Sequence, residues 1–356
     1  MGALLIAWTC GSVEKHGSTT ASLVRSGAPL RILVQARRPR LVYCASAKRS
    51  IVSEPVPSPP NHAVAAEIRQ LGRAFTPEIL QATYRLYTPY QQRAPKDGVS
   101  VHKDLAYGPD ERHRLDVFVP MKTPAKVPIV AYFHGGGYVG GERSPIPGLI
   151  YDNVPTFFAR HGFIGVNATY RLAPRYSWPS GGEDVGRVVG WLRSHAASFG
   201  GDADRIVLMG QSAGATHVAT WTFIGDVYGP AGPRIAGAIL LSGVYAPCDP
   251  DYYAVTPPEP HRVAYFGANA AKWPMMNPIK HVKPGHPPVF VSVTEFDPYP
   301  LQWGSPALVD ALLRCDKAMP WFVYSRKHNH VSPAMEINSE IDELGPELLA
   351  FLASVV

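Results

Sequence analysis

Two glycine-rich segments carry the residue types that an acyl-transfer reaction needs. The first is residues 134–137, His-Gly-Gly-Gly, and the second is residues 210–214, Gly-Gln-Ser-Ala-Gly. Each follows a short apolar run, 129–133 or 205–209, of the kind that forms a buried strand. A serine on a tight strand-to-helix turn can act as a nucleophile, and bare glycine amides can stabilise an oxyanion. The sequence therefore predicts an enzyme.

Ser212 is the candidate nucleophile. The backbone at such a sharp reversal is strained and needs side-chain-free neighbours two positions away, and Gly210 and Gly214 meet that demand. Residues 215–221 contain no helix breaker, so a helix can begin at the turn. Its N-terminus would bring partial positive charge near the serine hydroxyl.

The first glycine-rich segment is the candidate oxyanion loop. We expect the N–H groups of Gly136, Gly137 and Ala213 to face the anionic intermediate. The side chain of His134 is expected to brace the loop.

The same segment also fits the G-x-G-x-x-G pattern of dinucleotide-binding loops. That interpretation requires a helix to open at once and a carboxylate about 20 residues later, after the next strand. Pro145 and Pro147 interrupt the helix, and residues 167–171, at the end of the next strand, contain no acid. We therefore expect no nucleotide and no other cofactor.

The candidate acid and base follow the last two predicted strands. Asp297 comes just after the strand 288–293, and the carboxyl end of a strand is where an α/β sheet collects its site. Asp297 is the predicted acid, with Glu295 as the alternate.

His330 is the predicted base, with His328 as the alternate; both follow the strand 321–325. Two histidines at i and i+2 without further ligand spacing are poor evidence for a metal. Nothing else in the chain supports a nuclease interpretation of His-Asn-His. We expect no metal.

Strand and helix patterns alternate from residue 99 onward, which predicts an α/β fold with a mostly parallel sheet of about eight strands flanked by helices. The predicted strands are 99–107, 113–119, 128–133, 162–169, 205–209, 235–242, 288–293 and 321–325. The predicted helices include 185–192, 212–223, 306–315 and 337–355.

Residues 61–356 are expected to form one catalytic domain with two additions. Residues 61–95 predict a helical cap, with Thr76 as an N-cap and Pro77 at the first helical position. This segment either packs against the body or covers an active site as a lid. Residues 244–287, rich in Pro, Tyr and His, are expected to form an excursion over the sheet.

The basic charge of the chain is concentrated in a leader, residues 1–60. The net charge is +6, but the leader holds eight of the 34 basic residues and two of the 28 acidic ones, which leaves 26 of each in the body. A nucleic-acid face is therefore not expected. The composition of the leader fits three interpretations: a disordered tail, a gene start placed too far upstream, or a mitochondrial transit peptide. We expect a cytoplasmic protein, or a mitochondrial one if the leader is a real transit peptide.

Other global features fit such a protein. The four cysteines are scattered without metal-like spacing, which favours a reducing compartment. No apolar run approaches the ~18 residues that a membrane span requires.

With these residues in place, residues 99–355 resemble the hormone-sensitive-lipase-like branch of the α/β-hydrolase family. The resemblance rests on residues 134–138 (His-Gly-Gly-Gly-Tyr), 170–174 (Tyr-Arg-Leu-Ala-Pro), 210–214 and 297–298 (Asp-Pro). Asp184 and Trp191 also stand where that family has an Asp and a Trp before the elbow.

Some features are similar to kynurenine-formamidase and feruloyl-esterase-like relatives instead. They are the residues of the elbow, Gly-Gln-Ser-Ala-Gly-Ala, and His217 nearby. The base region, His-Asn-His-Val, departs from the His-Gly-Phe that the lipase-like family more often has. The resemblance implies cofactor-free hydrolysis of small acyl or aryl esters, and a possible homodimer. The alternatives are an arylformamidase acting on N-formyl amides, and a non-catalytic small-molecule receptor on the same fold.

Overall fold

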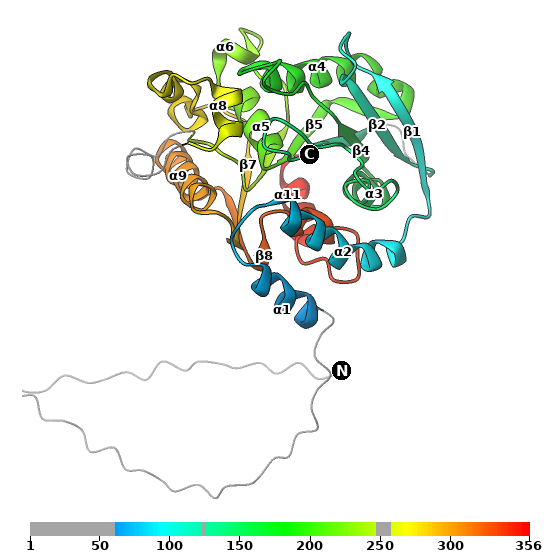
Figure 1. Ribbon diagram of the computed structural model, residues 1–356. Helices are drawn as coiled ribbons and strands as arrows, with labels where there is room; N and C mark the ends of the chain where they lie inside the picture. The colour runs from blue at the N-terminus through cyan, green and yellow to red at the C-terminus, as the bar shows by residue number, and fades with distance from the viewer. Residues whose placement is uncertain (1–60, 123–125, 247–257) are drawn as a thin grey trace, which may run out of the picture. The chain divides into compact units, whose positions relative to one another are not determined.

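The computed structural model describes residues 61–122, 126–246 and 258–356, which belong to one compact unit (Figure 1). The predicted leader, residues 1–60, and part of the excursion, residues 247–257, lie outside the described residues.

Eight strands form one sheet in the order β1-β2-β4-β3-β5-β6-β7-β8. β1 pairs with β2 and β2 with β4 in antiparallel fashion, and all other neighbours are parallel. This confirms the predicted mostly parallel sheet. The strands are β1 Val99–Ala106, β2 Arg114–Pro120, β3 Val127–Phe133, β4 Ile164–Ala168, β5 Gly201–Gln211, β6 Gly237–Leu241, β7 Val289–Phe296 and β8 Trp321–Asn329.

The central strands are buried on both faces because helices cover both sides of the sheet. Strand β3 shows the division: Ile129, Ala131 and Phe133 point into one apolar cluster, and Val130 and Tyr132 point into the other. The alternation follows from the two-residue period of a strand, and it explains why a strand covered on both faces reads as an unbroken apolar run.

Each face has its own helices. The first cluster contains side chains of α4 (Ser180–His195), α5 (Ala213–Phe223) and α9 (Tyr299–Asp316). The second contains side chains of α1 (Asn61–Leu71), α2 (Pro77–Arg93), α3 (Asn153–Arg160), α10 (Ser332–Glu336) and α11 (Gly345–Val355). Short helical pieces complete the described chain: η1 Ala196–Phe199, α6 Gly225–Tyr228, α8 Pro260–Phe266, η2 Ala270–Met276 and η3 Pro278–His281.

The N-terminal helices follow the predicted pattern. Thr76 caps α2, accepting a hydrogen bond at Oγ1 from the Ile79 N–H at 3.4 Å, and Pro77 stands at the first helical position. Tyr84 and Tyr87 of α2 are buried in the second apolar cluster. The helix therefore packs against the body.

The described part of the excursion packs over the first glycine-rich segment. Tyr265, Phe266 and Trp273 of the excursion form a small third cluster with Tyr138 and Ala213. The rings of Tyr138 and Tyr265 are stacked, with centroids 4.5 Å apart. The excursion thus covers the loop that follows β3.

The predicted helix 337–355 is helical only from Gly345 to Val355, so its predicted start was wrong. The chain instead forms α10 and α11, because Asn338 between them has a left-handed φ of +73° that no α-helix continues through. The buried carboxylate of Glu336 accepts the N–H groups of Glu343 and Leu344 at 3.1 and 3.2 Å, which fixes the connection. β7 and β8 are also longer than predicted, so His328 lies inside β8.

Across the described ranges, no helix combines the length and apolar character needed to cross a bilayer.

Candidate active site

Ser212 lies on a strained turn between β5 and α5. Its backbone has φ +56° and ψ −121°, and its N–H donates to the carbonyl of Leu241 at 2.9 Å. A Cβ on Gly210 would clash with the Gly214 carbonyl, and one on Gly214 would clash with the carbonyl of Phe133. Both glycines are therefore required by close backbone approach, as the pattern indicated.

A continuous chain of hydrogen bonds joins the hydroxyl of Ser212 to an imidazole and a carboxylate. His330 Nε2 lies 2.7 Å from Ser212 Oγ, and His330 Nδ1 lies 2.7 Å from Asp297 Oδ1. All three residues are buried. A carboxylate at Nδ1 keeps the proton there, so Nε2 is free to accept the serine proton.

The Asp297 carboxylate is held from its other side. Its Oδ2 accepts a hydrogen bond from Ser242 Oγ at 2.7 Å and one from the Thr294 N–H at 2.7 Å. Oδ1 is thereby left for His330. Sequence reasoning did not find Ser242; its only signal is its position directly after β6, at the same edge of the sheet.

The alternative base, His328, and the alternative acid, Glu295, contact other groups. His328 places Nδ1 2.9 Å from Ser332 Oγ and Nε2 3.3 Å from Glu336 Oε2, and burial lowers the pKa of His328 to about 4. Glu295 accepts the backbone N–H of Lys327 at 2.8 Å. The geometry therefore favours His330 and Asp297 as base and acid.

The predicted oxyanion loop runs alongside Ser212. A Cβ on Gly135 would lie 3.1 Å from Ser212 Cβ. Gly136 and Gly137 have φ of +142° and +59°, and a Cβ on Gly136 would clash with the Gly140 carbonyl. Within the described residues, the N–H groups of Gly136, Gly137 and Ala213 donate no hydrogen bond to another protein group. They are available to an anion.

His134 braces this loop. Its Nδ1–H donates to the Gly135 carbonyl, 2.6 Å away, and its ring stacks on Tyr170 with centroids 4.5 Å apart. The Tyr170 hydroxyl donates to the His134 carbonyl at 2.8 Å. Burial lowers the pKa of His134 to about 4, which keeps this imidazole neutral near pH 7.

A cavity of about 740 Å³ opens above Ser212. Its surface combines the serine and the glycine loop with apolar side chains from three parts of the chain. Among the lining residues are Phe75, Leu80, Tyr84, Tyr138, Leu172, Val244, His261 and Leu301. The concave shape is typical of a small-molecule site: its surface is largely apolar, with polar and charged side chains such as Glu142, Glu259 and Arg262 among the lining residues.

The N-terminal helical segment forms one wall of this cavity. It therefore both packs against the body of the domain and covers part of the candidate site. The ring of Phe75 meets that of His330 edge-on, with centroids 4.9 Å apart. Leu80 of α2 lines the same space. Sequence reasoning missed Phe75, although an apolar residue just before an N-cap, followed by Leu80 at the fourth helical position, is the pattern of a hydrophobic staple.

Asp184 lies outside the cavity and holds the segment next to the glycine loop. Its carboxylate accepts the backbone N–H of Arg171 at 2.8 Å, pairs with the Arg171 guanidinium at 2.8 Å and lies 3.0 Å from His113 Nε2. Arg171 follows Tyr170, whose hydroxyl binds the His134 carbonyl. Asp184 therefore acts on the site indirectly, by holding the segment that contacts the glycine loop.

Replacing Asp184 with asparagine is expected to lower the free energy of unfolding by about 2–3 kcal/mol at pH 7. Breaking a buried ion pair typically costs about 3–5 kcal/mol of stability. We expect a smaller loss here because the Arg171 side chain is partly exposed to solvent and keeps its ion pair with Glu183. Burial alone would raise the pKa of Asp184, but hydrogen bonds from His113 and Arg171 leave it lowered. The stabilisation is thus complete above the unfolded pKa, about 3.9, and is lost as the pH falls through the lower folded pKa.

Urea unfolding of wild type and variant, at neutral pH and at successively lower pH, measures this difference. The difference in the free energy of unfolding between wild type and Asp184→Asn should become smaller at acidic pH. Asp204→Asn, which removes an 82% exposed partner of Arg193, is the matched control and should change stability by no more than about 0.5 kcal/mol. Equal losses in the two variants would contradict the assignment.

Comparisons with known proteins show that this chain is similar in sequence to esterases. Residues 115–225 match the BD-FAE family model. Esterase LipC of Mycobacterium tuberculosis (strain ATCC 25618 / H37Rv) is 31% identical over 165 residues, which cover 42% of this chain and 40% of that protein. The probable isoprenylcysteine alpha-carbonyl methylesterase ICMEL1 of Arabidopsis thaliana is 30% identical over 149 residues, 42% of this chain and 28% of the relative. The chain thus spans less than half the length of these curated relatives.

Solved esterase structures share the fold. A bacterial heroin esterase superposes with a TM-score of 0.62 at 22% identity, over 82% of this chain and 97% of that one. Esterase B of Lactobacillus rhamnosis gives 0.62 at 18% identity, over 83% and 96%. Together with the eight-stranded sheet, these similarities show that the chain is an α/β-hydrolase-fold protein related in sequence to esterases.

Proposed function

We propose that this chain is a serine hydrolase that cleaves carboxylic esters of small acyl or aryl substrates. The observation that carries the proposal is the unbroken hydrogen-bond chain from Ser212 through His330 to Asp297, with its serine end facing a largely apolar cavity. The sequence relatives named as esterases support the same reaction class.

In the proposed first half-reaction, Ser212 Oγ attacks the ester carbonyl carbon while its proton passes to His330 Nε2. The imidazolium that forms is stabilised by the Asp297 carboxylate at Nδ1. The carbonyl π-electron pair moves onto oxygen, where the N–H groups of Gly136, Gly137 and Ala213 are placed to donate to it. Collapse of the tetrahedral intermediate re-forms the carbonyl and breaks the C–O bond to the alcohol, which takes the proton from His330.

In the second half-reaction, a water molecule replaces the alcohol. His330 removes a proton from the water as it attacks the acyl-enzyme carbonyl, and returns that proton to Ser212 Oγ when the acid leaves. No step calls for a cofactor. Each proton moves between Ser212 Oγ, His330 Nε2, the departing alcohol and water.

The cavity supports a preference for small acyl groups. It is bounded by Phe75 and α2 on one side and by Tyr138 and the excursion on the other. We expect p-nitrophenyl acetate and butyrate to be hydrolysed faster, by kcat/KM, than esters of long-chain acids. Initial rates over an acyl chain-length series measure this.

The same assay with an N-formyl aryl amide tests the arylformamidase alternative. If the formamide were cleaved and all esters were left intact, ester hydrolysis would be wrong and the acyl-transfer machinery would stand. If no substrate were turned over while small esters still bound, the receptor interpretation would replace both.

A further inference from the structure

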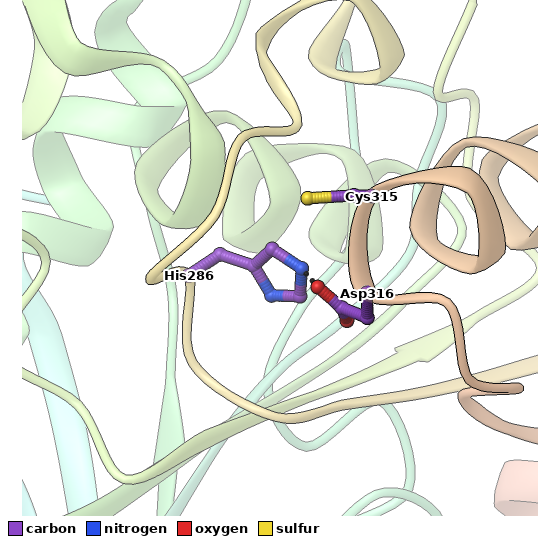
Figure 2. A group of neighbouring side chains, drawn as sticks. All are labelled: His286, Cys315 and Asp316. Atoms are coloured by element: carbon purple, nitrogen blue, oxygen red, sulfur yellow. Dashed lines mark ion pairs between the residues drawn. The ribbon is translucent and has the colours of Figure 1, made fainter.

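A second cluster of reactive side chains joins the C-terminal end of α9 to the loop before β7. Cys315 and Asp316 come from the last turn of α9, and His286 lies three residues before β7 (Figure 2). One ligand atom from each residue (imidazole nitrogen, thiol sulfur and carboxylate oxygen) lies within 4.8 Å of the other two. The ion pair drawn in Figure 2 joins His286 Nε2 to Asp316 Oδ2, 3.2 Å apart.

The imidazole of His286 is held in one orientation. Its Nδ1 lies 2.8 Å from the Pro287 carbonyl, which can only accept, so Nδ1 carries the hydrogen. The ring of Phe223 packs edge-on against the imidazole, with centroids 5.7 Å apart. A backbone carbonyl at one ring nitrogen is the arrangement that orients a histidine whose other nitrogen binds a metal.

The other nitrogen has no hydrogen bond. The side chain of His286 is 7% exposed, and within the described residues its buried Nε2 lacks any partner of hydrogen-bonding geometry, although the Asp316 carboxylate is close. In the neutral ring, Nε2 presents a lone pair to a carboxylate oxygen. Two electron-rich atoms in such proximity are stabilised by a cation between them.

We propose that His286 Nε2, Cys315 Sγ and an Asp316 carboxylate oxygen bind a divalent transition-metal ion of the Zn²⁺ class. Zn²⁺ takes nitrogen, sulfur and oxygen ligands together, in a tetrahedral arrangement. The Asp316 side chain is 40% exposed, so solvent can supply a water molecule as fourth ligand. Binding forms the metal–sulfur bond with loss of the thiol proton to solvent.

The electrostatics of the helix end favour a cation here. Asp316 is the last residue of α9, an 18-residue helix, and the C-terminus of a helix carries partial negative charge. The ammonium of the neighbouring Lys317 donates to the Arg314 carbonyl at 2.7 Å.

The location assigns the metal a stabilising role. β7 has eight residues and separates His286 from Asp297, so the two sites lie at opposite ends of a strand of about 26 Å. The metal would fasten the end of α9 to the loop before β7. We expect it to raise thermal stability and to leave ester turnover unchanged.

Titration of the chelator-treated full-length chain with Co²⁺ tests the site. We expect one equivalent to bind with a thiolate-to-cobalt charge-transfer band, and Zn²⁺ to abolish that band by displacement. Cys315→Ser should remove the band, and Asp316→Asn should weaken Co²⁺ binding at least tenfold. With saturating Zn²⁺, the melting temperature of the wild type should rise, and that of His286→Gln should not.

Two controls isolate the cluster. Asp310→Asn removes an exposed carboxylate of the same helix and should bind Co²⁺ as the wild type does. A chain with Cys10, Cys44 and Cys248 replaced by serine should keep the band. A band that persists in Cys315→Ser, or no binding by the wild type, would overturn the proposal and leave His286 and Asp316 as a simple ion pair. If Cys315→Ser does not fold, the wild type and Asp316→Asn decide.

Discussion

Replacing Ser212 with alanine is expected to lower kcat for ester hydrolysis by about 10⁶-fold, the loss typical of removing the nucleophile from such a unit. Within the described residues, the Ser212 hydroxyl lies 2.7 Å from His330 Nε2, and Ser212 Cβ lies against the predicted oxyanion loop. Without it no acyl-enzyme forms, so the burst of alcohol release should vanish as well. Pre-steady-state and steady-state rates on a p-nitrophenyl ester measure both effects.

A second serine serves as the control for this experiment. Ser305 of α9 is fully buried, and the described part of the chain offers its hydroxyl no hydrogen-bond partner. Ser305→Ala should therefore retain the burst and a kcat within about threefold of wild type. If Ser212→Ala kept substantial activity, the proposed nucleophile would be wrong, whatever the substrate.

Asp297→Asn is expected to lower kcat by about 10⁴-fold while leaving the fold intact. The asparagine oxygen would remain with its two donors, Ser242 and the Thr294 N–H, which turns the amide NH₂ toward His330 Nδ1. The imidazole must then accept at Nδ1 and carry its hydrogen on Nε2, so it can no longer take the Ser212 proton. Rates measured over a pH series should recover in alkaline solution, as deprotonated serine becomes available.

Glu295→Gln separates the two candidate acids. Glu295 binds the Lys327 N–H instead of an imidazole. We expect its replacement to change kcat by less than about threefold. A loss in Glu295→Gln that matched the loss in Asp297→Asn would contradict the geometric assignment.

Much of the site could be predicted because it depends on local backbone chemistry. The glycines around Ser212 are needed wherever a strand reverses sharply into a helix, so their spacing is visible in the sequence. The strand positions were predictable for a similar reason, since a strand buried on both faces must be apolar throughout. The same logic failed at residues 337–344, where a left-handed Asn338 keeps the chain out of the helix that the apolar pattern suggested.

The amino-acid sequence by itself determined the sheet, the serine turn, the glycine loop and the order of the candidate acid and base. Only the tertiary structure shows which of His328 and His330 contacts Ser212. His328 and His330 are only two positions apart in the sequence. Packing directs the His330 side chain to Ser212 and the His328 side chain to Glu336. The tertiary structure also brings Phe75 to His330, Ser242 to Asp297, and His286 to Cys315. The members of each pair come from distant segments of the chain. The sequence could not predict these contacts, because contacts between distant segments leave no periodic signal in either segment.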